Sequence, residues 1–141
     1  MCRMRVNVLA VGLGDKSEVL HDLPVQLFVV NNCAEAIRCL KDKRLDAVIS
    51  QWDLVDVSQG QFLSRVTSAK PGFPAIAIVK GGDVRQEMAA RSLGVIAVLE
   101  DDIDDDYFRD TVCHVLGIDS IAGVLLAKGS NNSNEISYSA L

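Results

Sequence analysis

The chain has 141 residues, enough for one domain with its own hydrophobic core. Hydrophobic residues make up 49% of it and charged residues 23%, so the composition is that of a globular protein that needs no disulfide or metal ion to fold. The net charge of −5 disfavours binding to nucleic acid, and no apolar run has the roughly 18 residues of a membrane span. We therefore expect a cytoplasmic protein.

Five short apolar runs, rich in Val, Ile, Leu and Ala, are spread along the chain. They show little alternation with polar residues, which is typical of strands buried on both faces of a parallel sheet. In chain order, the predicted strands are residues 6–11, 25–30, 47–49, 75–79 and 95–99.

Helix-capping pairs follow the first four runs. In each pair a short polar residue, able to accept hydrogen bonds from the free amides at a helix start, stands three positions before Glu or Gln. The four pairs are Asp15 with Glu18, Asn32 with Glu35, Ser58 with Gln61, and Asp83 with Gln86. Apolar residues then recur at helical spacing, and the predicted apolar stripe of the fourth helix is Val84, Met88 and Ala89. A fifth helix follows the fifth strand.

Strands and helices thus alternate five times, which predicts an α/β fold. Right-handed crossovers give a doubly wound, five-stranded parallel sheet of flavodoxin-like order 2-1-3-4-5. We expect this domain to occupy residues 1–117, followed by a possible extra helix over 118–128 and a flexible tail over 129–141, where Gly, Ser and Asn predominate. Whether an effector domain follows in a longer protein stays open.

Two segments resemble the receiver domain of response regulators, the phospho-acceptor module of two-component signalling. One is LDAVISQWDLVDVS at residues 45–58, followed by Phe62 and Leu63, and the other is GVIAVL at residues 94–99. The resemblance covers about residues 4–117. It implies a phosphorylation site at the carboxyl ends of the strands, where ligands gather in such sheets.

The residues that the resemblance places at this site differ from those of the family almost everywhere. Gln51 stands where the phospho-accepting aspartate is expected, and an amide does not attack phosphorus as a carboxylate does. Gly12 and Leu13 replace the two acids that would hold Mg²⁺. The remaining departures are Val79 for the switch Ser or Thr, Val98 for the switch aromatic residue, and Asp101 for the lysine that would pair with the phosphoryl group. We therefore expect a pseudo-receiver with no catalytic residue, no metal and no cofactor, and not an enzyme.

Other carboxylates could serve as non-standard phosphosites. Asp53 lies two residues beyond Gln51, but we expect it to be a water-exposed loop carboxylate, and we expect Asp15 to cap the first helix. The acidic run at residues 100–106 fits the start of the fifth helix, and a docking patch for a basic partner is its alternative role.

The sequence thus predicts a domain that acts in signal transduction by protein–protein interaction, independently of phosphorylation at the usual site. A signalling kinase or an effector is the expected partner. The resemblance nominates the surface of the fourth helix, fifth strand and fifth helix, which could also form a homodimer, and the candidate residues there are Met88, Arg91, Tyr107 and Arg109. The alternative is a small-molecule or nucleotide-binding regulatory domain of flavodoxin-like fold, using the glycine turns after the first and fourth strands.

Overall fold

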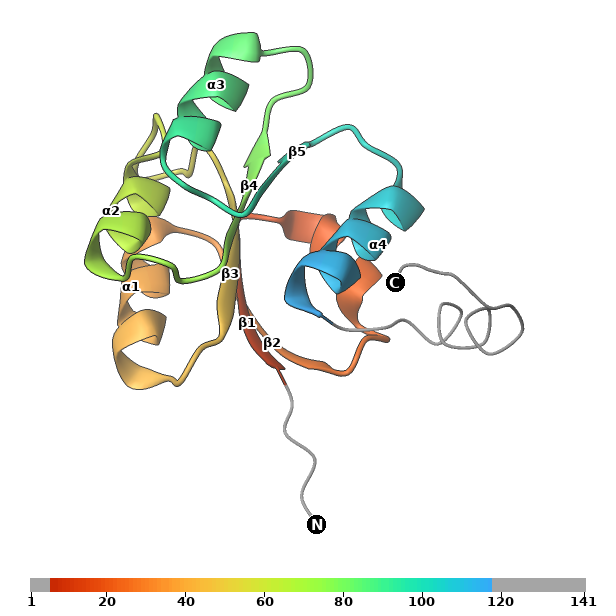
Figure 1. The fold of residues 1–141 in the computed structure, drawn as a ribbon. Coiled ribbons are helices and arrows are strands. Elements are labelled where there is room, and N and C mark those ends of the chain that lie inside the picture. Colours follow the sequence, from red (N-terminus) through yellow and green to blue (C-terminus); the bar gives the residue numbers. More distant parts are fainter. Residues whose placement is uncertain (1–5, 118–141) are drawn as a thin grey trace.

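A computed structural model describes residues 6–117, in which five parallel strands form one sheet with helices on both sides (Figure 1). The order in the sheet is β2-β1-β3-β4-β5, which confirms the predicted fold. The strands are β1 (Val6–Val11), β2 (Val25–Val30), β3 (Ala47–Gln51), β4 (Ala75–Val79) and β5 (Ala97–Glu100). The expectations for residues 118–128 and 129–141 lie outside the described residues.

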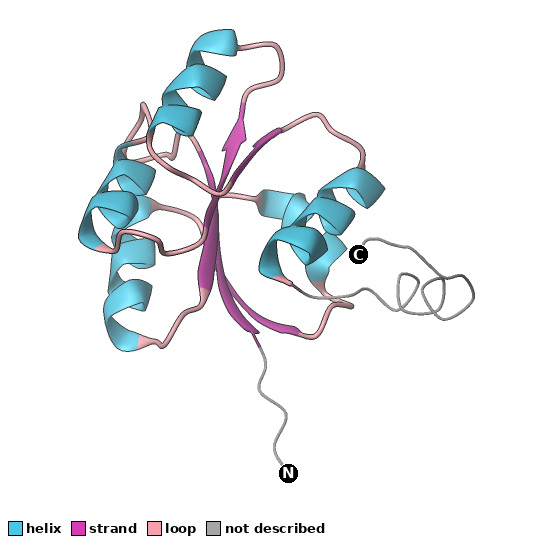
Figure 2. Ribbon diagram, viewed as in Figure 1, coloured by secondary structure: helices cyan, strands magenta, loops and turns pink. Residues whose placement is uncertain are grey.

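The helices divide between the two faces of the sheet (Figure 2). They are the 3-10 helix η1 (Gly14–Leu20) and the α-helices α1 (Cys33–Asp42), α2 (Gln61–Ala69), α3 (Val84–Ser92) and α4 (Asp105–Leu116). Helices η1 and α4 cover one face, and α1, α2 and α3 cover the other. The fourth and fifth predicted helices are therefore α3 and α4.

Two hydrophobic clusters, one on each face, hold these layers together. Successive side chains of a strand point to opposite faces, so Val8 of β1 packs with Phe108 of α4, whereas Leu9 belongs to the cluster that contains Phe62 and Leu63 of α2. All five residues of β4 are buried, as expected for a strand covered on both faces.

The bounds of two strands, β3 and β5, differ from the prediction because pairing with β4 decides them. β3 continues to Gln51, since Ser50 and Gln51 lie in register with Ala77 and Ile78. β5 begins at Ala97, the first of its residues in register with β4.

Two of the four predicted capping pairs are present. The Asn32 Oδ1 accepts a hydrogen bond from the Glu35 amide at 2.8 Å, and the Asp83 Oδ1 accepts one from the Gln86 amide at 3.1 Å. These bonds satisfy amides that would otherwise be free at the starts of α1 and α3.

The other two capping predictions are wrong. Asp15 does not cap the first helix, because η1 is a 3-10 helix that already begins at Gly14. Ser58 does not cap α2, whose N-cap is Gly60 at a φ of 70°. The ring of Trp52 lies against Gly60 so closely that any Cβ there would overlap it. The packing of Trp52 thus decides where α2 starts.

The apolar stripe predicted for α3 is also wrong. Val84 and Met88 are 62% and 66% exposed, and Ala89 is exposed as well. Ala90 is the buried residue of this helix. A side chain as small as Ala90 lets the helix lie close to the sheet while its larger apolar residues face solvent.

Candidate functional site at the carboxyl edge of the sheet

The carboxyl ends of β1 and β3 meet side by side, because Val11 lies in register with Ser50. This places Gly12 beside Gln51, as the resemblance to receivers implies. Gly12 has a φ of 70°, and a Cβ built on it would lie 2.8 Å from the Leu54 Cδ2 and 3.5 Å from the Gln51 Cγ. A side chain at position 12 would therefore be strained and would have to displace Leu54.

The surroundings of Gln51 are apolar or neutral. Leu13 and Trp52 are buried, at 5% and 7% exposure, and Ser50 is completely buried. The Ser50 hydroxyl donates a hydrogen bond to the Gln51 carbonyl at 2.9 Å, so its polarity is satisfied locally. Nothing in this group can supply the charge that a phosphoryl group with Mg²⁺ needs.

The ends of β4 and β5 carry carboxylates instead. The Asp101 amide donates to the Val79 carbonyl at 2.8 Å, and the Asp101 Oδ1 accepts from the Gly81 amide at 2.9 Å. Asp102 lies over Gly81 so closely that a Cβ at position 81 would overlap its carboxylate. The residue at the expected lysine position is thus an acceptor that closes the turn after β4. Val79 is buried and Val98 is partly buried, as apolar core residues.

Asp53 is exposed, as expected, but it is also part of a link between two elements. Its Oδ1 accepts from the Gln59 amide at 2.6 Å, and its Oδ2 accepts from the Gln86 side-chain amide of α3 at 3.3 Å. Asp15 is exposed in the first turn of η1.

Sequence reasoning missed Asp56, which ties the same loop to α1. Its two carboxylate oxygens accept hydrogen bonds from the Cys33 amide at 2.8 Å and the Ala34 amide at 3.0 Å, the first amides of α1. These bonds, that from Cys33 above all, hold the pKa of Asp56 below its ordinary value. No local sequence pattern predicts this contact, because Asp56 lies 23 residues from Cys33. The segment of residues 52–60, called here loop 52–60, is therefore fixed to α1 on one side and to α3 on the other.

The glycine turn after β4 borders an open pocket of about 410 Å³ at the start of α3. This is where the alternative reading places an anion. However, the Lys80 amide donates to the Gln86 Oε1 at 2.9 Å, and the Gly81 amide donates to Asp101. Two amides that could bind an anion already have partners in the chain itself.

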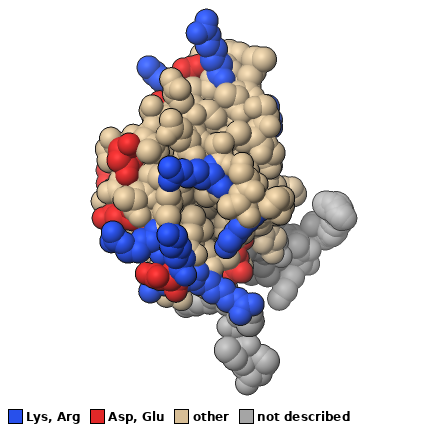
Figure 3. All heavy atoms as spheres, turned by 90° about the vertical axis from the view of Figure 1, so that its left-hand side faces the viewer, with Lys and Arg blue, Asp and Glu red and all other residues tan. Residues whose placement is uncertain are grey.

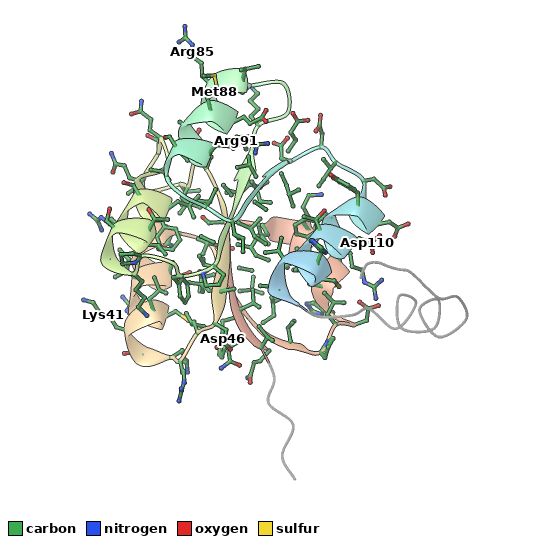
Figure 4. The ribbon with its side chains drawn as sticks, in the orientation of Figure 1. Lys41, Asp46, Arg85, Met88, Arg91 and Asp110 are labelled. Atoms are coloured by element: carbon green, nitrogen blue, oxygen red, sulfur yellow. The ribbon has the colours of Figure 1, made fainter. Side chains whose placement is uncertain are left out.

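Three of the four predicted interaction residues lie on open surface. Met88 is 66% exposed and Tyr107 is 59% exposed, and Arg91 is exposed in an ion pair with Glu87 at 2.9 Å. Figure 4 shows Arg85, Met88 and Arg91 along α3 at one end of the molecule.

Arg109 is the fourth predicted interaction residue, and its place differs from the expected one. Its Nη2 and Nε bond the two carboxylate oxygens of Asp22 at 2.7 and 3.2 Å, and its side chain is only 21% exposed. The guanidinium is thus held at the end of η1 and is not presented beside α3.

Within residues 6–117 no helix is long and apolar enough to cross a membrane. The same residues contain no group of three or more His, Cys, Asp or Glu side chains arranged to hold a metal ion.

No family model matches the chain. Comparison with curated proteins finds transcriptional regulatory proteins. The chain is 29% identical over 73 residues to the transcriptional regulatory proteins GlrR of Escherichia coli (strain K12) and QseF of Escherichia coli O157:H7. The match covers 52% of this chain but only 16% of either relative.

Solved structures of receiver domains superpose on most of the chain. A CheY-like receiver domain protein from Methanospirillum hungatei JF-1 has a TM-score of 0.72 at 11% identity, covering 81% of this chain and 95% of that one. The receiver domain of a putative LuxO repressor protein from Vibrio parahaemolyticus has a TM-score of 0.72 at 19% identity, covering 92% and 100%. A receiver protein from Burkholderia phymatum has a TM-score of 0.69 at 24% identity, covering 83% and 99%. The fold of this chain is therefore that of a response-regulator receiver domain.

Proposed function

We propose that this domain acts in signal transduction by binding protein partners in the cytoplasm, as a pseudo-receiver that is not phosphorylated at position 51 and is not an enzyme. The observation that carries the proposal is the chemistry of the carboxyl edge, where Gly12, Leu13 and Gln51 are neutral and Asp101 is anionic. Phosphoryl transfer to an aspartate needs a nucleophilic carboxylate, acids for a divalent cation and a cation for the new negative charge.

The packing around Gly12 supports the same proposal. Leu54 occupies the space that an acidic side chain at position 12 would need, and the backbone there has a conformation that favours glycine. Loop 52–60, which would face a phosphoryl group, is fixed by Asp56 to α1 and by Asp53 to α3. Packing at Gly12 and the hydrogen bonds of loop 52–60 thus leave little room at this edge for a metal ion and a phosphoryl group.

The proposed docking site is the α3–β5–α4 surface, defined here by Met88, Arg91, Ile96 and Tyr107. Its three apolar members are at least half exposed, and they come from α3, from the residue before β5 and from α4. Exposed apolar residues gathered on one surface are typical of interaction sites. A signalling kinase or an effector is the proposed partner, with a second copy of the chain as the homodimer alternative. The curated relatives are transcriptional regulatory proteins, which supports a regulatory setting.

The test is phosphorylation by a small donor. The purified chain and a phosphorylatable receiver domain are incubated in parallel with acetyl phosphate and Mg²⁺, and their intact masses are measured. We expect no added phosphoryl group on this chain and one on the control. A stoichiometric adduct would overturn the proposal, and peptide mapping would then show whether Asp53 or Asp15 carries it.

A further inference from the structure

An open groove lies between α1 and α2, on the face of the sheet that α3 also covers. Its volume is about 340 Å³, and Ile37 and Leu40 of α1 and Val66 of α2 give it an apolar lining. Ile37 and Leu40 are only partly buried, so the fold leaves apolar surface uncovered here. We call this feature, with the basic residues described next, the α1–α2 groove.

Three basic side chains border the same groove. Lys41 comes from α1, Arg65 from α2, and Lys70 from the residue that ends α2. Cations therefore stand on both sides of the apolar lining. Within residues 6–117 none of the three forms an ion pair, although other cations of the chain do.

The charge of the two segments that form the groove is opposite to that of the chain as a whole. Residues 33–44 and 61–70 together contain six basic residues and two acidic ones, whereas the chain has a net charge of −5. Figure 3 looks onto this face and shows Lys and Arg side chains over its lower half, with uncharged surface and some Asp and Glu side chains between them. Figure 4 shows Lys41 at the outer side of α1. A local positive patch on an acidic protein selects for an acidic partner at this one place.

We infer that the α1–α2 groove is a second docking site, and that it binds an amphipathic helix of a partner protein whose apolar stripe is flanked by Asp and Glu. The apolar stripe of such a helix would cover Ile37, Leu40 and Val66, as in other helix-in-groove complexes. Its carboxylates would meet Lys41 on one side and Arg65 and Lys70 on the other. The inference is independent of the proposed function, since it concerns different elements and needs no statement about phosphorylation.

The test uses a fluorescently labelled synthetic peptide of about four helical turns. It has Leu at positions i, i+3, i+4 and i+7 and Glu at most others, and binding is followed by anisotropy. A peptide of the same composition in scrambled order keeps the charge but has no apolar stripe. We expect saturable binding of the patterned peptide and at least about tenfold weaker binding of the scrambled one.

Variants of the chain locate the binding site. Arg65→Glu should weaken binding of the patterned peptide by about tenfold or more, whereas Arg85→Glu, with the same charge change on exposed α3, should change it by less than about twofold. Ala69→Trp should also weaken binding, because it fills the groove from an exposed position without changing the charge. Circular dichroism of each variant checks that the fold is kept.

Several results would overturn the inference. These are no binding of the patterned peptide, equal binding of the scrambled peptide, or equal effects of Arg65→Glu and Arg85→Glu. Sedimentation of the free chain gives another: a dimer of the wild type that Arg65→Glu dissociates would show that a second copy occupies the groove. Binding of decanoate that depends on Arg65 and excludes the peptide would assign the groove to small anionic amphiphiles instead.

Discussion

The carboxyl edge of the sheet and the outer sides of α1, α2 and α3 differ in how far their side chains are packed and hydrogen-bonded within the chain. At the edge, Leu54 packs over Gly12 and Trp52 packs over Gly60, and Asp53, Asp56 and Asp101 all hold backbone amides. On the outer sides, Val84 and Met88 are exposed, and within residues 6–117 Lys41, Arg65 and Lys70 form no ion pair. The comparison shows that the side chains at the carboxyl edge pack against the loops or hold backbone amides, while large apolar side chains of α3 face solvent.

The largest expected effect is a loss of folding stability on substitution of Gly60, at the tightly packed carboxyl edge. Gly60→Ala puts a Cβ into the Trp52 ring at a φ of 70°, so it should lower the free energy of unfolding by about 3 kcal/mol. Gly72→Ala is the matched control, because its φ is 84° but nothing lies near the added Cβ, and it should cost about 1 kcal/mol. Urea denaturation measures both. Equal losses would show that Trp52 does not determine the conformation at Gly60.

A smaller loss of stability is expected for Asp56→Ala, which removes both acceptors from the start of α1. Asp110→Ala is the control, since Asp110 is exposed on α4 and its side chain makes no hydrogen bond or ion pair among the described residues (Figure 4). Thermal unfolding at neutral pH should separate Asp56→Ala from the wild type but not Asp110→Ala. No difference between the two variants would mean that loop 52–60 is not fixed through Asp56.

The effect of Asp56→Ala should depend on pH. The pKa of Asp56 is lowered in the folded state, so its ionised form stabilises the fold above the ordinary aspartate pKa of 3.8. That contribution is lost as the pH falls from 3.8 through the lower folded-state pKa. The stability difference between the wild type and Asp56→Ala should thus be complete at pH 7 and shrink under acid. A difference that grows on acidification would contradict the assigned hydrogen bonds.

Ligand screening tests the alternative function, in which the carboxyl edge binds a nucleotide or another small molecule. Nucleotides and inorganic phosphate, each with Mg²⁺, should leave the unfolding temperature unchanged, because the amides of Lys80 and Gly81 already have partners. An increase that Lys80→Ala abolishes would instead support the small-molecule-binding domain.

The smallest effect on stability is expected on the α3–β5–α4 surface. Met88→Glu changes a side chain that is 66% exposed, so it should alter the free energy of unfolding by no more than about 0.5 kcal/mol. The same change should weaken binding of a partner at this surface. A large loss of stability would show that Met88 belongs to the core after all.

The strands could be predicted from sequence because burial on both faces leaves continuous apolar runs. The capping predictions succeeded at Asn32 and Asp83, where the bond is between residues three apart, and failed at Ser58, where contact with Trp52 decides the helix start. Helical spacing does not say which side of α3 meets the sheet, so it wrongly placed Val84 and Met88 in a buried stripe, whereas the resemblance to receivers nominated Met88 as a surface residue.

At the candidate site, the sequence predicted which residues lie at the edge of the sheet, but not the hydrogen bonds that they make. Gly12 and Gln51 are neighbours as predicted, because parallel strands end at one edge. The bonds of Asp53 and Asp56 join segments far apart in the chain, and such pairing depends on how loop 52–60 crosses the edge.

Loop 52–60 has a mechanical consequence for the whole face that α1 and α3 share. Asp56 grips the first turn of one helix, and Asp53 reaches the first turn of the other through Gln86. A shift of either helix along the sheet would stretch hydrogen bonds that start from this one loop. The link to α3 is a single exposed hydrogen bond of 3.3 Å, whereas Asp56 accepts hydrogen bonds from two backbone amides of α1, so we expect the contact with α3 to break first when the two helices move apart.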